Sequence, residues 1–364
     1  MSDKEVEKLA EIKPSFDENR QKLGKILPLN TPFNIQIDSS EACNFKCEYC
    51  FRAKQDKAAW GYAAHGGLME WDLFTKIVDQ IMEFPEQVRQ ISLSVHGEPL
   101  CNRNVPRMAQ YIKAKGITSR ISLHTNASLL DEKYARELAT SGVDRIVVSL
   151  QGMTAQKYKD TCGVQIDYDQ FYHNLEILSR TKKQMQIHVK VVDAALDAGE
   201  EELFYEKYRP IAERVYVEKV VPIWKDAGKN AGDADFSGNK YGSKFPKQHC
   251  CPVLFHTMVV TPQGDVYPCT QLLFPQPLGN VKANTLVNLW NSEERLRMLQ
   301  EQLEGREMAA CHGCYIKENS IFMEEDLIDP YSEEVLDRVL QKNSKNSNKN
   351  DSEGLSFPKP LRYT

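Results

Sequence analysis

Short apolar runs rich in valine and isoleucine alternate with segments of helical periodicity through the first two thirds of this chain. The strand-like runs are at 34–38, 90–95, 119–124, 145–150, 186–192 and 214–221. Helical patterns lie between them, most clearly at 69–83, 105–115 and 131–141. Alternation of this kind predicts parallel strands with right-handed crossovers. The sequence therefore predicts an α/β fold, a partial (β/α)6 TIM-type barrel followed by a small α+β domain.

A trio of cysteines follows the first predicted strand. Cys43, Cys47 and Cys50 form the run C-N-F-K-C-E-Y-C. Three thiolates on one loop can hold three irons of a cubane 4Fe-4S cluster and leave the fourth iron without a protein ligand. A structural zinc site closes all four positions, and this loop has no fourth cysteine or histidine nearby. The spacing favours a redox cluster whose open iron can bind a substrate or cofactor.

The residues around the trio resemble those of the radical S-adenosylmethionine (SAM) enzymes. The pattern is C-x3-C-x2-C with Tyr49 before the last cysteine and Phe51 after it. In that family the open iron chelates SAM, and the reduced cluster cleaves SAM to a 5'-deoxyadenosyl radical that abstracts hydrogen. The resemblance implies that the three cysteines bind this cluster and that both aromatics line the adenine side of SAM. Ordinary core aromatics are the alternative for Tyr49 and Phe51.

Three further elements follow the next three strands, where barrel enzymes collect their chemistry. H-G-E-P at 96–99 resembles the family's G-G-E-P element, which accepts hydrogen bonds from the SAM ammonium group, with His96 in place of glycine. T-N-A at 125–127 resembles a T-N-G element, and S-L-Q-G at 149–152 resembles the segment that contacts the SAM ribose. Each is a common turn when taken alone. In this order they imply that the SAM-binding residues are Gly97, Glu98, Asn126 and Ser149.

Four later cysteines have a second ordered spacing. Cys251 and Cys269 flank a predicted hairpin, with strands at 257–261 and 266–269, and Cys311 and Cys314 form a C-x2-C pair. The pattern resembles the short twitch form of the SPASM extension of radical SAM enzymes. The resemblance implies that these four thiolates bind one auxiliary 4Fe-4S cluster. A structural zinc site is the alternative, and Cys250 is an alternative ligand to Cys251.

Composition predicts where the protein is located and which partners it lacks, and the polar segments predict how the chain divides into parts. Ten cysteines without a secretory leader or a membrane-length apolar run predict a cytoplasmic protein that has no membrane partner. A net charge of −5 argues against a nucleic-acid partner. The predicted parts are an N-terminal helical extension at 1–28, a radical SAM core at 29–224, a linker at 225–248, a twitch/SPASM-like Fe-S domain at 249–325, and a C-terminal helix with a disordered tail at 326–364.

The reaction is an inference from the resemblance. An auxiliary cluster near the substrate can accept an electron from a carbon radical, so hydrogen abstraction becomes a two-electron oxidation. The pattern is most similar to 2-deoxy-scyllo-inosamine dehydrogenase-like enzymes. This implies oxidation of a secondary alcohol of a sugar or aminocyclitol-type small molecule, two 4Fe-4S clusters, and an external low-potential electron donor of the flavodoxin or ferredoxin type. Candidates for removing the hydroxyl proton are Lys190, Glu218 and Lys219.

Three other functions remain open. Cys162, or Cys101 as second choice, could donate a hydrogen atom to the substrate radical and make the protein an epimerase, although a buried structural cysteine is the alternative for both. A peptide-modifying maturase is the next possibility. A non-catalytic iron or redox sensor is the last, and it would not need the elements that follow strands two to four.

Overall fold

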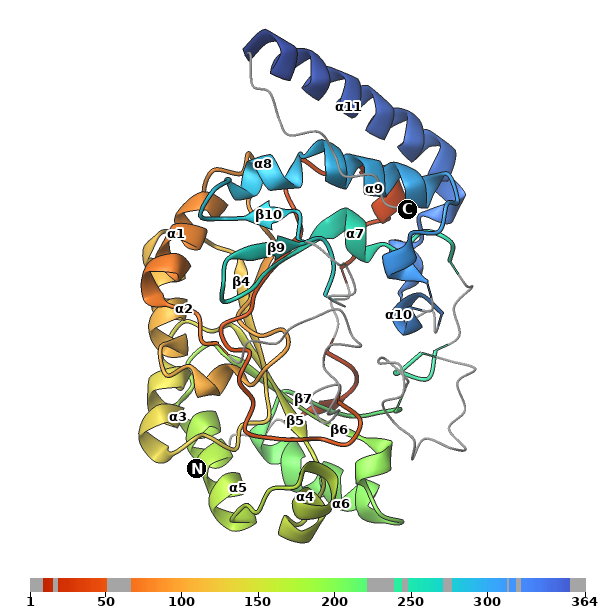
Figure 1. Cartoon of the computed structure of the whole chain (residues 1–364). Coiled ribbons are helices and arrows are strands. Elements are labelled where there is room, and N and C mark those ends of the chain that lie inside the picture. The colour runs from red at the N-terminus through yellow and green to blue at the C-terminus, as the bar shows by residue number, and fades with distance from the viewer. Residues whose placement is uncertain are drawn as a thin grey trace, which may run out of the picture.

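The computed structural model describes residues 9–15, 19–50, 67–220, 239–243, 248–270, 277–312, 314–318 and 322–353. All six predicted core strands are present and run parallel to their neighbours (Figure 1). These strands are β2 (Asn34–Ile37), β3 (Gln90–Ser92), β4 (Arg120–Thr125), β5 (Arg145–Leu150), β6 (Gln186–Val192) and β7 (Arg214–Glu218). The prediction of a parallel α/β core is confirmed.

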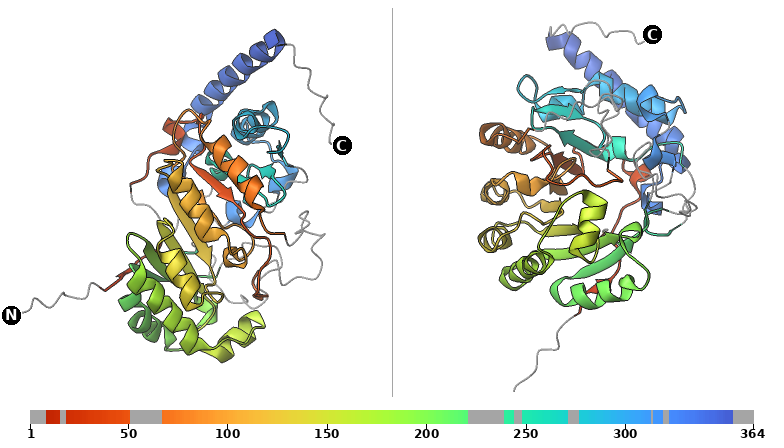
Figure 2. Two further views of the ribbon diagram at one scale, coloured as in Figure 1. Left: turned by 90° about the vertical axis from the view of Figure 1, so that its left-hand side faces the viewer. Right: turned by 60° about the horizontal axis from the view of Figure 1, so that its bottom comes forward.

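Helices join these strands and cover the outer face of the sheet (Figure 2). They are α1 (Trp71–Ile81), α2 (Val105–Ala114), α3 (Glu132–Ala139), α4 (Ala155–Cys162), α5 (Tyr168–Thr181) and α6 (Glu200–Tyr208). In α1 the residues Phe74, Ile77, Val78 and Ile81 recur at helical spacing and are all buried. The three helices predicted from periodicity are therefore confirmed.

The strands alternate apolar and polar side chains. On β6, Ile187, Val189 and Val191 pack in the hydrophobic core, while His188 and Lys190 lie on the other face. Because neighbouring strands are in register, polar residues gather on the inner face of the sheet, opposite the helices. The fold thus puts ionisable groups inside the barrel and keeps the apolar layer outside.

The C-terminal region continues the same sheet. Its elements are α7 (Val253–His256), β8 (Thr257–Val260), β9 (Asp265–Tyr267), β10 (Gly279–Asn280), α8 (Leu286–Trp290), α9 (Glu293–Leu303), α10 (Tyr315–Glu318) and α11 (Ser332–Glu353). β8 pairs parallel with β2, and β8 and β9 form the predicted antiparallel hairpin. With β1 (Glu11–Ile12), the sheet order is β1-β7-β6-β5-β4-β3-β2-β8-β9-β10. The barrel is open, with β1 and β10 as its edges.

Two terminal expectations are wrong. In the described part of 1–28 there is no α-helix: β1 pairs with β7, and a single 3-10 turn spans Leu23–Lys25. The polar run K-N-S-K-N-S-N-K-N at 342–350 belongs to the segment for which we expected a disordered tail, and it lies within α11. The buried residues Val335 and Val339 anchor the start of this helix, and extending a formed helix costs far less than starting one. None of the described helices has the length and apolar character needed to cross a lipid bilayer.

A buried arginine ties α9 to α7. Arg295 is 2% exposed, and its guanidinium donates hydrogen bonds to the carbonyls of Trp290, Leu254 and Phe255. The guanidinium carbon also lies 3.2 Å from the centre of the Trp290 ring. Burial lowers the pKa of Arg295 to about 9. This residue holds the last carbonyls of α7 against the helix that precedes the last two cysteines.

We predict that Arg295→Ala destabilises the protein by about 3 kcal/mol, because three buried carbonyls lose their donor and a cavity forms. Arg297→Ala is the matched control, since Arg297 is an exposed arginine on the same helix. Thermal unfolding of both variants checks this. Equal melting temperatures for the two variants would contradict the assigned role of Arg295.

Candidate active site

The first cysteine loop lies beyond the C-terminal end of β2 and rests on the end of α4. The backbone N–H of Lys46 donates to the carbonyl of Cys162 at 3.1 Å, and that of Glu48 donates to Thr161 at 3.0 Å. Within the loop the N–H of Cys50 donates to Cys47. Cys43, Cys47 and Cys50 are therefore held on one anchored turn, at the edge where barrel chemistry is expected.

Cys162 packs directly against this loop. Its sulfur is 3.6 Å from that of Cys47, and its side chain is fully buried beside Phe45 and Tyr158. The hydrogen bond to Cys162, followed by burial, raises the pKa of the Cys47 thiol. Cys162 therefore lies behind an expected cluster ligand. Cys101 is half-buried, and its N–H donates to the backbone carbonyl of Glu98 at 3.1 Å.

Tyr49 lies within electrostatic range of the same cysteines and of Tyr158. Burial, and then the charges of Cys47, Cys162, Tyr158 and Cys50, raise the pKa of its hydroxyl. Its role toward the adenine of SAM stays a prediction. Phe51, predicted to share that role, lies outside the described residues.

Glu98 is held by the elements that follow two strands. It is 2% exposed and accepts hydrogen bonds from Asn126 N–H at 2.7 Å, from Leu100 N–H at 3.0 Å and from the Thr125 hydroxyl. Burial raises its pKa to about 7, against the effect of these donors. A nearby cation, such as the ammonium group expected here, would favour the ionised form.

Two small residues shape this region. Ala127 has φ 59°, the left-handed conformation that glycine adopts in the T-N-G pattern. A Cβ on Gly97 would lie 2.0 Å from the carbonyl oxygen of Ser40 and 2.5 Å from that of Ala42. Only glycine therefore allows the 96–99 turn to lie against the segment that leads to Cys43.

Lys190, Glu218 and Lys240 form an ion triad on the inner face. Lys190 Nζ is 2.5 Å from Glu218 Oε2, and Lys240 Nζ is 2.8 Å from Glu218 Oε1. Burial opposes ionisation of Glu218, but the two lysines outweigh it and lower its pKa to about 2. Burial lowers the pKa of Lys190, whereas Glu218 raises that of Lys240 despite burial. Lys190 is therefore the member that loses its proton most readily.

The triad lies next to the expected SAM contacts. Lys190 on β6 is the register partner of Ser149 on β5, and Glu218 is the partner of Val192. The third predicted proton acceptor, Lys219, is exposed. His124, at the end of β4, lies within electrostatic range of Lys190 and Lys240. Desolvation of its ring, followed by the charges of Lys190 and Lys240, lowers the pKa of His124 to about 3, although the residue is exposed to solvent on its other side.

Cys251 and Cys269 flank the open end of the β8–β9 hairpin, where the chain enters β8 and leaves β9. Burial, followed by the charges of Cys269, Cys314 and Cys311, raises the pKa of the Cys251 thiol. Burial and then Cys314 raise that of Cys311 to about 12. The charges of Cys269, Cys314 and Cys311 act on Cys251, and such a set of thiols fits a metal cluster, whose positive irons would stabilise the thiolates. Among the described residues no three His, Cys, Asp or Glu side chains converge on a single-ion site.

The structure separates Cys250 from Cys251. The Cys250 thiol donates to the carbonyl of Gln302 at 3.3 Å, and its N–H donates to Asp329 at 2.8 Å. Burial, followed by Asp329, raises the pKa of the Cys250 thiol, Lys317 opposes this rise, and no other cysteine contributes to it. Cys251 is thus the member of the pair that faces Cys269, Cys311 and Cys314.

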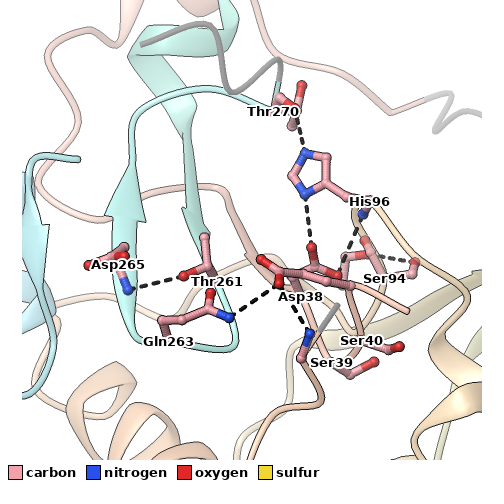
Figure 3. A network of polar contacts seen from close by, with 12 residues as sticks. Asp38, Ser39, Ser40, Ser94, His96, Thr261, Gln263, Asp265 and Thr270 are labelled. Carbon is pink, nitrogen blue, oxygen red and sulfur yellow. Dashed lines mark hydrogen bonds and ion pairs between the residues drawn. The ribbon is translucent and has the colours of Figure 1, made fainter. Parts of the chain in front are cut away.

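A buried bridge connects the two cysteine regions (Figure 3). His96 lies between Asp38, which follows β2, and Thr270, which follows Cys269. Its Nδ1 is 2.8 Å from Asp38 Oδ2, and its Nε2 is 2.9 Å from the Thr270 carbonyl oxygen. Sequence reasoning treated His96 only as a departure from the G-G-E-P element.

Sequence reasoning missed four residues of these networks. His124 carried a usable signal, because it ends a predicted strand, and so did Asp38. Lys240 carried none, since it lies in a glycine-rich segment predicted to be a linker. Thr270 acts through its backbone carbonyl, which any residue would supply.

The chain matches two protein-family profiles. Residues 37–192 match the radical SAM superfamily, and residues 250–315 match the SPASM iron-sulfur cluster-binding domain. These spans contain both cysteine sets and the strands β3 to β6, and the first span begins at the last residue of β2.

The sequence is also similar to individual proteins. A Methanococcus maripaludis protein named "Probable GTP 3',8-cyclase" is 38% identical over 135 residues, which cover 37% of this chain and 42% of that protein. The chain thus spans less than half the length of this relative. A Pyrococcus furiosus tungsten-containing aldehyde ferredoxin oxidoreductase cofactor-modifying protein is 23% identical over 346 residues, covering 82% of this chain and 92% of that protein.

A solved structure shows the same fold. The structure of anSMEcpe with bound AdoMet aligns with a TM-score of 0.54 and 17% identity, over 87% of this chain and 96% of that one. At this identity the likeness concerns the fold alone.

We predict that Cys251→Ala lowers bound iron from about eight to about four per chain, because Cys251 is a predicted ligand of one of two 4Fe-4S clusters. Cys250→Ala, an equally small change at an adjacent buried thiol, should keep all of the iron. Iron analysis and EPR of anaerobically reconstituted protein check this. Loss of iron from Cys250→Ala alone would reverse the assignment.

Proposed function

This chain belongs to the radical SAM superfamily and carries a C-terminal SPASM domain. We propose that it oxidises a secondary alcohol of a small polar molecule to a ketone, and that the substrate is a sugar. When bound, SAM and its cluster supply a 5'-deoxyadenosyl radical for hydrogen abstraction, and an auxiliary cluster supplies an electron acceptor. The proposed ligands are Cys43, Cys47 and Cys50 for the first cluster, and Cys251, Cys269, Cys311 and Cys314 for the second. An external low-potential reductant would start the reaction.

One observation carries the proposal. The hairpin that ends at Cys269 extends the barrel sheet directly beside β2, the strand that leads to Cys43. An electron acceptor built there shares a rigid support with the SAM loop. Oxidation needs such an acceptor, because the substrate radical must lose an electron, whereas epimerisation does not.

The placement of Cys162 also favours oxidation over epimerisation. A hydrogen donor must reach a substrate radical, but Cys162 is 0% exposed and lies against Cys47. In this position its thiol contacts a proposed cluster ligand. Cys101 is the remaining candidate donor, and a peptide-modifying activity remains the third candidate function.

Lys190 is the proposed acceptor of the hydroxyl proton. Burial lowers its pKa, a shift that favours the neutral amine, while the Glu218 carboxylate, with a pKa of about 2, is a weak base. Lys190 also lies beside Ser149, the proposed ribose contact. With Lys240 charged and Glu218 ionised, the triad has no net negative charge to hold an ammonium group. It therefore suits a neutral or anionic sugar, including a nucleotide-linked sugar, better than an aminocyclitol.

The reaction is tested with anaerobic, reconstituted protein, dithionite, SAM and a panel of sugars, sugar phosphates and nucleotide-linked sugars. We expect a product two hydrogens lighter than its substrate, formed with one 5'-deoxyadenosine per turnover, by mass spectrometry. A product of unchanged mass that takes up one deuterium from heavy water would indicate an epimerase instead.

We predict that Lys190→Arg lowers ketone formation on the order of 10²-fold, because arginine keeps the ion pair with Glu218 but does not give up its proton. Formation of 5'-deoxyadenosine should continue, since the radical chemistry precedes proton transfer. Lys219→Arg at the adjacent exposed position is the control and should match wild type. Full ketone formation by Lys190→Arg would exclude this lysine as the base.

A further inference from the structure

The contact between the two proposed cofactor regions centres on His96. This residue follows β3 and immediately precedes Gly97 and Glu98, two of the proposed SAM contacts. Its side chain is 2% exposed, and so it is shielded from solvent. The histidine stands where the family element has glycine, so the bridge is a feature of this chain and not of the G-G-E-P element.

Both hydrogen-bond partners of the imidazole are acceptors. Nδ1 faces the carboxylate of Asp38 at 2.8 Å, and Nε2 faces the carbonyl oxygen of Thr270 at 2.9 Å. With both nitrogens engaged by protein, the ring is not free to exchange a proton with substrate. His96 is therefore not a catalytic base.

Each end of the bridge is fixed to one cysteine region. Asp38 is 1% exposed, its N–H donates to Val260 of β8 at 2.8 Å, and its chain continues to Cys43. Thr270 is bonded covalently to Cys269, a proposed auxiliary ligand. A shift of the Cys269 end of the hairpin relative to the Cys43 loop would therefore break at least one of the two His96 hydrogen bonds.

The backbone around His96 is locked to the same loop. The Glu98 N–H donates to the Ala42 carbonyl at 2.8 Å, and Gly97 packs against Ser40 and Ala42 without room for a Cβ. A second contact also joins the hairpin to the segment before Cys43, because the Gln263 side chain donates to the Glu41 carboxylate at 3.2 Å. The 96–98 turn thus transmits any movement of the hairpin to the proposed SAM contacts.

We propose that His96 is a positioning residue that, with Asp38, fixes the auxiliary-cluster loop relative to the SAM loop and so sets the electronic coupling between the two clusters. The cluster ligands rest on the proposed function, but the bridge itself does not depend on the substrate. Failure of the bridge and failure of the oxidation reaction can therefore be told apart.

The test uses full-length, anaerobically reconstituted His96→Gly, which restores the glycine of the family element. We expect both clusters to assemble and SAM cleavage to stay within about twofold of wild type, because Gly97 and Glu98 are unchanged. The reduction potential of the auxiliary cluster and its magnetic interaction with the first cluster, both followed by EPR, should change. Amide hydrogen exchange at 265–270 should increase.

His173→Gln, at a histidine on the surface of α5, is the control and should match wild type in all three measurements. If His96→Gly fails to assemble both clusters, Asp38→Asn replaces it, because that variant keeps the side-chain size and takes away the carboxylate. The same spectral and exchange changes in Asp38→Asn support the bridge. Wild-type potential, interaction and exchange in the variant that assembles would overturn the proposal.

Discussion

The parallel pairing of β8 with β2 is the contact on which the arrangement of this protein depends. Four residue pairs, from Asn34 with Thr257 to Ile37 with Val260, join a C-terminal hairpin to the first strand of the barrel. A β-ladder is stiff along its length, so the loops at the ends of adjacent strands hold a fixed separation. The two proposed cluster loops follow β2 and β9, which both pair with β8, and because β9 is antiparallel the loops leave opposite ends of these strands.

The hydrophobic core continues across this junction. Met258, Val260, Val266 and Trp290 from the C-terminal region pack in the same cluster as the residues beneath α1 to α6. The SPASM domain is therefore not a separate unit attached to the described barrel by a flexible chain. Burial of common apolar surface resists relative motion of the two regions, and polar bridges such as that of His96 define the final position.

The inner face of the sheet is governed by electrostatics. Lys190, Glu218 and Lys240 are ionisable groups in a desolvated position, where each charge needs a partner. Glu218 satisfies both lysines, and its own ionisation is secured by them. Burial leaves Lys190 with a lowered pKa, although it stays paired with Glu218. A chemically useful amine can thus exist in the barrel without an unpaired buried charge.

The sequence alone determined the strand and helix order, the hairpin and both cysteine sets, because periodicity and ligand spacing are local properties of the chain. The ends were predicted less well: the polar run at 342–350 lacks apolar side chains, yet α11 extends through it from a buried first turn. Only the tertiary structure showed that Cys251 interacts electrostatically with Cys269, Cys311 and Cys314 while Cys250 does not. The tertiary structure placed Cys162 against Cys47 and joined Lys240 to Lys190 through Glu218. It also brought Thr270 to His96. These contacts connect residues as many as 174 positions apart, as in the His96–Thr270 pair, and depend on strand register that no local pattern encodes.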